Sequence, residues 1–112
     1  MSFIHTSENG MEKIEVEDSL DLYSVPAVKK YVKTLFINGS KKILMSLHKK
    51  VFVDSSGIGM IYHLCYEADS RGIRIAFYCE EEQSAYIIQK SRMDESLPLF
   101  TDLESSLDYL SK

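Results

Sequence analysis

The chain has 112 residues, of which 45% are hydrophobic and 27% charged, and its formal net charge is −4. This length and composition are typical of one globular domain that buries its core without disulfides or a metal, and they exclude a disordered chain. Because the balance is acidic and the basic residues form only short pairs such as Lys41-Lys42 and Lys49-Lys50, a nucleic-acid surface is not expected.

Export and membrane insertion are not expected either. The N-terminus lacks a basic region followed by an apolar run, and the chain has no stretch of about 18 apolar residues. Cys65 and Cys79 show neither metal-ligand spacing nor a disulfide framework. The sequence therefore predicts two buried free thiols in a cytoplasmic protein that needs no metal and no cofactor.

The first predicted element is a β-hairpin. Phe3 to Ser7 and Met11 to Val16 are short alternating stretches, and Asn9-Gly10 between them suits a tight two-residue turn. A helix is then predicted from Pro26, a residue favoured in the first helical turn, to the neighbourhood of Asn38-Gly39.

Strands and helices alternate through the rest of the chain. Strands are predicted at 42–47, 73–79 and 98–100, and helices at 56–70, 82–91 and 103–111. The short run Val51-Phe52-Val53 is also apolar in the manner of buried sheet, and Glu80-Glu81-Glu82 suits a helix start. This order predicts an α/β fold, a mixed β-sheet with crossover helices packed on it, in a single domain over residues 1–112.

The hexapeptide Asp54-Ser55-Ser56-Gly57-Ile58-Gly59 lies where a predicted strand passes into a helix. The N–H groups of a first helical turn have no intrahelical partners and the helix dipole is positive there, which favours an Asp or Ser oxygen. Gly57 and Gly59 lack side chains that would crowd an approaching protein or phosphate. Two interpretations fit this pattern: an ordinary helix cap, or an accessible Ser56 hydroxyl that gains and loses a phosphate.

The stretch from Ile43 to Ala68, an apolar strand followed by the hexapeptide and an apolar helix, resembles the signature of STAS domains, specifically of the bacterial anti-sigma factor antagonists. The resemblance extends over almost the whole chain. Ser19-Leu20-Asp21 is similar to the family's Leu-Asp step, and the stretches Gly72 to Phe77 and Leu99 to Asp102 are similar to its later strands. It implies a STAS-type single domain that acts in bacterial transcription regulation and signal transduction.

The resemblance also implies a partner switch. In this family the unphosphorylated form binds an anti-sigma factor that is itself a serine kinase, a histidine-kinase-like ATPase, and so frees the sigma factor. Phosphorylation of the motif's second serine, which is Ser56 here, ends that binding, and a metal-dependent serine phosphatase of the PP2C type resets the switch. Ser55 is a candidate secondary phosphorylation site. Asp21, Asp54 and Gly57 form the expected environment of the phosphosite.

The same switch has a physical basis in the residues. A phosphate on Ser56 adds about −1.5 to −2 charge beside Asp54, and like-charge repulsion with the cost of desolvation disfavours a packed interface. The helix N-terminus is expected to offer backbone N–H groups to the phosphate. The modification is therefore predicted to change a surface and leave the core intact.

The helix at 56–70 has more apolar residues than one core stripe needs. Met60, Tyr62 and Tyr66 fall off the stripe that runs from Ile58 to Ala68, and tyrosine and methionine are favoured at recognition surfaces. We therefore predict a partner-binding surface, with packing against neighbouring loops as the alternative. Its members are Ile58, Gly59, Met60, Tyr62 and Tyr66.

Three positions depart from the family pattern: Asp18, Ser46 and Lys50. They reduce the acidic surround of the serine to Asp21 and Asp54, which leaves the identity of the kinase open because partners recognise local charge. Two alternatives therefore stay beside the sigma-factor function. One is a STAS interaction or scaffold module in a kinase–phosphatase switch with another output, and the other is a small-ligand sensor.

An enzyme is not expected. His5, His48 and His63 have no sequence context that would make a nucleophile triad with Ser56, and the motif is not a Gly-x-Ser-x-Gly elbow. A Gly-rich phosphate-binding loop with its lysine is also missing. The chain is predicted to be a kinase substrate without catalytic residues of its own.

Overall fold

The computed structural model describes residues 3–47, 51–91 and 97–112. Strands β1 (Phe3–Glu8) and β2 (Met11–Val16) form an antiparallel hairpin in which Glu8 pairs with Met11. Asn9 and Gly10 have φ angles of 53° and 79°, the left-handed conformation that a two-residue hairpin turn requires at both positions. The predicted hairpin is confirmed.

The main sheet has five strands in the order β1-β2-β4-β6-β7. Strands β4 (Lys42–Leu47), β6 (Arg74–Tyr78) and β7 (Leu99–Phe100) continue from β2 in parallel pairs. Only the β1–β2 pair is antiparallel within the described residues, so the sheet is mixed, as predicted. Parallel neighbours require crossover connections, and the helices supply them.

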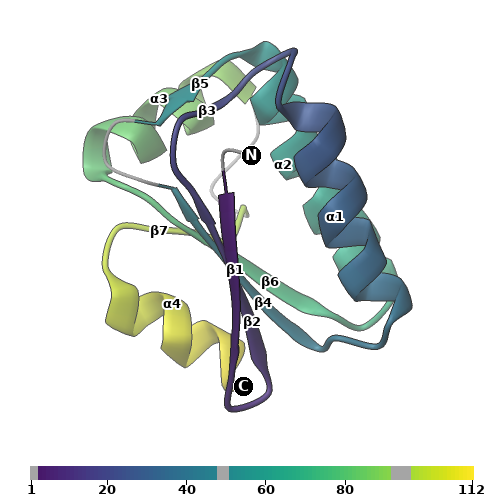
Figure 1. Cartoon of the computed structure of the whole chain (residues 1–112). Helices are drawn as coiled ribbons and strands as arrows, with labels where there is room; N and C mark the ends of the chain where they lie inside the picture. Colours follow the sequence, from purple (N-terminus) through teal and green to yellow (C-terminus); the bar gives the residue numbers. More distant parts are fainter. Residues whose placement is uncertain (1–2, 48–50, 92–96) are drawn as a thin grey trace.

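Helices cover both faces of this sheet (Figure 1). On one face lie α1 (Val25–Ile37), α2 (Ser55–Ser70) and α3 (Glu81–Ser91), and on the other lies α4 (Leu103–Leu110). Side chains alternate along a strand, so Met45 and Phe77 enter the larger core while Leu44 and Ala76 pack with Leu110 under α4. The α/β fold is thus confirmed.

A second, two-stranded parallel sheet joins β3 (Ser19–Leu20) to β5 (Phe52–Val53) above the main sheet (Figure 1). Leu20 and Val53 are buried, but Phe52 is 61% exposed. The prediction that residues 51–53 form buried sheet is therefore wrong for Phe52, because this narrow ribbon has a solvent-facing side. Of the three positions that depart from the family pattern, Asp18 and Ser46 lie within the described residues and Lys50 lies outside them.

Both cysteines are free, with Cys79 buried and Cys65 half-buried. Burial raises the pKa of the Cys65 thiol to about 12 and that of the Cys79 thiol to about 11. Both thiols are free, as predicted, but only Cys79 is fully buried.

The two thiols are expected to be inert in the folded protein. An unfolded thiol ionises near pH 8.5, and the thiolate is the nucleophile, so at that pH a disulfide reagent is expected to react at least about 100-fold more slowly with the native chain than with the denatured chain. Because the folded pKa values are raised, the thiols also lower stability progressively as the pH rises above about 8.5. Equal labelling rates with and without denaturant would contradict this expectation.

Candidate functional site

Asp54 starts α2 as its N-cap. Its backbone is extended (φ −98°, ψ −172°), and its Oδ1 accepts hydrogen bonds from the N–H groups of Ser56 at 2.8 Å and Gly57 at 3.1 Å. Two of the first-turn donors that a helix leaves unpaired are thereby satisfied. The cap interpretation of this residue is confirmed.

The same carboxylate joins α2 to the loop before α1. Asp54 Oδ2 accepts a hydrogen bond from the Leu22 N–H at 3.2 Å, and the Asp54 N–H donates to the Leu20 carbonyl at 3.1 Å. Three N–H donors from two separate segments therefore converge on one side chain. Asp54 fixes how the loop after β3 and the start of α2 lie side by side.

Asp21 organises that loop in turn. Its Oδ1 accepts from the N–H groups of Tyr23 at 2.9 Å and Ser24 at 3.0 Å, and its Oδ2 accepts from the Ser19 hydroxyl at 3.0 Å. Hydrogen bonds from the Ser24 N–H and the Ser19 hydroxyl hold the pKa of the Asp21 carboxyl below its usual value. The structure thus places the two predicted carboxylates, Asp21 and Asp54, on adjacent loops.

Gly57 permits a close approach of β3 to the first turn of α2. A Cβ atom at this position would lie 2.4 Å from the Leu20 carbonyl oxygen and 2.9 Å from both Leu20 Cβ and Val53 Cγ1. Gly57 is buried, so the prediction that its missing side chain makes room for a partner is wrong. Gly59 differs, because it is exposed and nothing would lie within 4 Å of its Cβ.

The two serines lie at the start of α2 with their hydroxyls unengaged. Ser55 is exposed and Ser56 is half-buried, and neither hydroxyl has a hydrogen-bond partner among the described residues. The N–H groups of Ser56 and Gly57 are already taken by Asp54. These two amides of the helix N-terminus are therefore not free for a phosphate, and Asp54 lies beside the position that a phosphate on Ser56 would take.

The predicted partner-binding residues on α2 divide into two groups. Tyr62 and Tyr66 are 46% and 70% exposed. Met60 is 2% exposed and Ile58 8%, and both belong to the main core. The prediction that Met60 lies off the core stripe is wrong, because α2 packs against α1 and α3 as well as the sheet and so buries a wider arc of its surface.

Sequence reasoning missed three exposed apolar side chains beside the serines, Leu22, Tyr23 and Phe52, which we call the apolar rim. They are 65%, 88% and 61% exposed, and Leu22 is tied to Asp54 through its N–H. The sequence did carry a signal for these residues. All three are large apolar residues outside the predicted helices, and they lie just after Asp21 or just before Asp54. A patch of this kind is typical of a protein-binding surface.

The described histidines do not contact the serines. His5 interacts with Glu12 and Tyr31, and His63 lies 3.5 Å from Glu67 one helical turn away. Across residues 3–47, 51–91 and 97–112 there is also no group of three or more His, Cys, Asp or Glu side chains placed to hold a metal. No helix in these ranges is both long and apolar enough to cross a membrane.

Replacing Asp54 with alanine is expected to destabilise the domain by about 2 kcal/mol, because an N-cap oxygen is lost and the Leu22 N–H loses its partner. Asp54→Asn is the matched control, since it keeps a cap oxygen, and its expected cost is less than about 1 kcal/mol. Urea unfolding of the two variants measures the difference. Equal stability of Asp54→Ala and the native chain would show that the cap contributes nothing.

Comparison with known proteins assigns the family. The family model of the STAS domain matches residues 6–106, so this chain belongs to the STAS domain family. No curated protein sequence matches it significantly.

Solved structures share the fold over nearly the whole chain. An anti-sigma factor antagonist from Mycobacterium paratuberculosis superposes with a TM-score of 0.81 at 16% identity, covering 98% of this chain and 93% of that one. The antagonist SpoIIAA in its unphosphorylated form gives 0.74 at 17% identity, with 97% and 96% covered. The phosphorylated form of SpoIIAA, a Bacillus cell fate determinant, gives 0.68 at 17%, with 95% and 96% covered.

Proposed function

We propose that this protein is an anti-sigma factor antagonist controlled by phosphorylation at Ser56. The unphosphorylated form binds a serine-kinase anti-sigma factor, a histidine-kinase-like ATPase, and releases the sigma factor. Phosphorylation ends that binding, and a PP2C-type phosphatase restores it. The observation that supports this most is the unengaged, half-buried Ser56 hydroxyl beside Asp54, next to the exposed apolar rim. The STAS fold shared with SpoIIAA, which has been solved in both forms, supports it as well.

The physical basis of release is the charge that phosphorylation adds. A partner that covers Leu22, Tyr23 and Phe52 also removes water from Ser56. A phosphate there carries about −1.5 to −2 charge, and burying it without new cationic partners is costly. The carboxylate of Asp54 adds like-charge repulsion. It also occupies the first-turn amides, which therefore cannot offset the charge of the phosphate.

The modification is proposed to leave the fold in place. The Ser56 hydroxyl has no hydrogen bond to lose within the described part of the chain, and the core residues of α2 lie deeper, from Ile58 to Ala68. The phosphate therefore acts on the surface that meets the partner. The protein itself supplies the hydroxyl, and ATP with its magnesium belongs to the kinase.

Ser55 occupies a different position from Ser56, although the two are neighbours. Ser55 is exposed, whereas Ser56 is half-buried between Asp54 and the buried Gly57. A group attached to Ser55 has more room to point into solvent. We propose Ser56 as the switch residue and Ser55 as a secondary site.

The proposed partner can be identified by affinity capture. The full chain, its Ser56→Ala variant and its Ser56→Asp variant are immobilised and exposed to extract from the source cells with ADP and magnesium, and the retained proteins are identified by mass spectrometry. The native and Ser56→Ala chains are expected to retain a histidine-kinase-like ATPase, and Ser56→Asp is expected to lose it. Retention of the ATPase by all three chains would contradict the switch, and retention of none would favour a scaffold or ligand-binding STAS module.

A further inference from the structure

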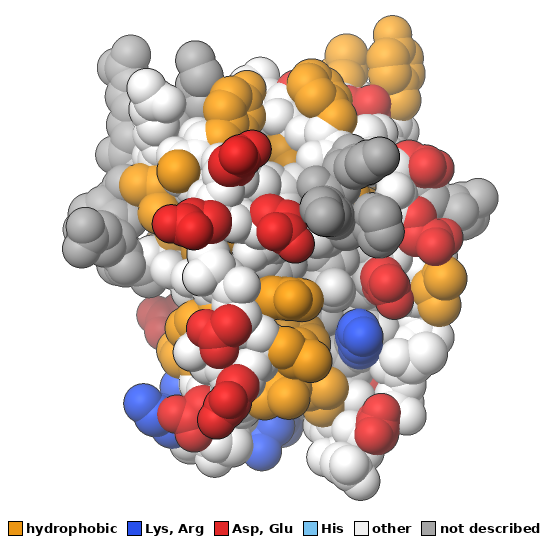
Figure 2. All heavy atoms as spheres, turned by 90° about the vertical axis from the view of Figure 1, so that its left-hand side faces the viewer, with side chains coloured by type: hydrophobic (Ala, Val, Ile, Leu, Met, Phe, Trp, Pro, Cys, Tyr) orange, Lys and Arg blue, Asp and Glu red, His pale blue; other side chains and the backbone are white. Residues whose placement is uncertain are grey.

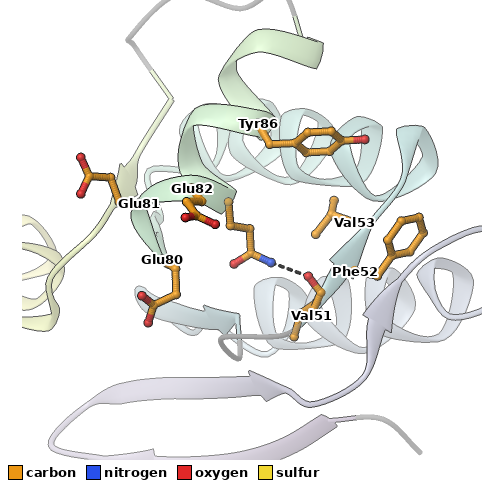
Figure 3. Close-up of a pocket in the computed structure, with 8 residues that line it drawn as sticks. Val51, Phe52, Val53, Glu80, Glu81, Glu82 and Tyr86 are labelled. Atoms are coloured by element: carbon orange, nitrogen blue, oxygen red, sulfur yellow. Dashed lines mark hydrogen bonds between the residues drawn. The ribbon is translucent and has the colours of Figure 1, made fainter.

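A groove runs beside β5, on the side toward the start of α3 (Figure 3). Its volume is about 820 Å³. Its lining comes from two short segments, namely Val51, Phe52 and Val53 on one side and Glu80, Glu81, Glu82, Gln83 and Tyr86 on the other.

A hydrogen bond joins the two walls of the groove. Gln83 Nε2 donates to the Val51 carbonyl oxygen at 2.6 Å and so fastens α3 to the segment that leads into β5 (Figure 3). Val51 and Val53 are buried, whereas Phe52 and Tyr86 expose 61% and 41% of their surface. The apolar part of the groove therefore combines the aliphatic and aromatic groups of residues 51–53 with Tyr86 of the opposite wall.

The wall formed by the start of α3 is also acidic. Glu80, Glu81 and Glu82 are all exposed, and among the described residues none of the three forms an ion pair and no Lys or Arg lines the groove. The face that presents α3 and α4 shows acidic side chains next to hydrophobic ones across its upper part (Figure 2). An occupant that buries apolar surface here therefore lies next to a cluster of three exposed carboxylates.

We propose that this groove docks a basic segment of the protein partner, with Lys or Arg side chains on both sides of one large apolar side chain. The apolar side chain packs on Val53, Phe52 and Tyr86, and the cations face the three glutamates. Cations placed over an aromatic face gain further attraction, and the exposed ring of Phe52 offers such a face. Acidic clusters at an interface act mainly on partner choice and association rate, and salt weakens them.

The groove is continuous with the proposed switch site. Val53 precedes Asp54 directly, and Phe52 belongs both to the groove and to the apolar rim around the serines. A partner that binds over Ser56 therefore extends along β5 into the groove. The identification of that partner with the kinase rests on the proposed function, whereas the basic, apolar-centred chemistry of the segment follows from the groove alone.

The test uses a peptide and needs no kinase. The full chain labelled with nitrogen-15 is titrated at low salt with an acetylated, amidated Lys-Leu-Arg-Lys peptide, and amide shifts are followed by NMR. The largest shifts are expected at Val53, Glu82 and Tyr86, with affinity falling at least about threefold on raising the salt to physiological strength. A Glu-Leu-Glu-Glu peptide of the same length is the control and is expected to shift none of them.

Two variants test the acidic side. Glu81→Lys with Glu82→Lys is expected to weaken the basic peptide at least about fivefold, while Glu104→Lys on α4 changes little. If this charge reversal unfolds α3, the milder double variant Glu81→Gln with Glu82→Gln is used in its place. Equal binding of both peptides, or unchanged binding to the charge variants, would overturn the groove inference. If the peptide fails while the ATPase is captured, only the groove inference is wrong; if the peptide binds and no ATPase is captured, only the proposed function is wrong.

Discussion

Gly57→Ala is expected to destabilise the domain by about 3 kcal/mol, the largest loss of stability that we predict for one methyl group here. The new Cβ would lie 2.4 Å from the Leu20 carbonyl oxygen, a backbone atom that cannot rotate away. To relieve this contact, β3 must move off α2, and overpacking of this kind costs about 1–3 kcal/mol or more. That movement would also lengthen the hydrogen bond from the Asp54 N–H to Leu20.

Gly59→Ala is the matched control, two positions along the same helix. Nothing would lie within 4 Å of its Cβ, and the site is exposed. Replacing glycine by alanine in an exposed helix is expected to stabilise by about 0.5–1 kcal/mol. Urea unfolding of both variants measures the opposite signs. A stability loss at Gly59 equal to that at Gly57 would show that helix propensity, and not the approach of β3, decides the effect.

Phosphorylation of Ser56 is expected to weaken binding to the captured kinase at least about 100-fold, since uncompensated burial of a charged group costs about 3 kcal/mol or more. The same modification is expected to change the free energy of unfolding by less than about 1 kcal/mol, because this hydroxyl has no hydrogen bond within the described residues. Isothermal calorimetry and urea unfolding of the purified phosphorylated chain give the two values.

Ser55 provides the control for that measurement. Ser55→Ala is expected to keep the native affinity within about threefold and to be phosphorylated normally, because the side chain is exposed. Ser56→Ala is expected to bind the kinase as the native chain does and to take up no phosphate at position 56. A tenfold or greater loss of affinity in Ser55→Ala would move the centre of the interface to that residue.

Local chemistry explains which parts of the fold could be predicted. Asn9 and Gly10 adopt the left-handed conformation that only a few residue types accept, and Asp54 supplies the cap oxygen that a helix start needs. These signals depend on neighbours in sequence, so they placed the hairpin and the start of α2 correctly. Alternation and helical spacing located the longer strands and the helices for the same reason, whereas the two-residue strand β3 was not predicted.

The errors at the site come from contacts between distant segments. Met60 is buried because helices flank α2 on both sides, and Gly57 is needed because Leu20, far away in the chain, crosses the first turn. Phe52 is exposed because, among the described strands, β5 pairs with the two-residue strand β3 alone. Such pairings leave no periodic trace in the sequence, and the apolar rim could not be predicted without them.

The most direct test of the central claim is a phosphate map of the native protein. The protein is isolated from its own cells with phosphatases inhibited, under growth and under stress, and both its phosphorylated residues and its copurifying proteins are identified by mass spectrometry. We expect phosphate on Ser56 in one condition and a serine-kinase regulator bound to the unmodified form in the other. A Ser56 that stays unmodified in every condition, with no ATPase bound, would contradict it.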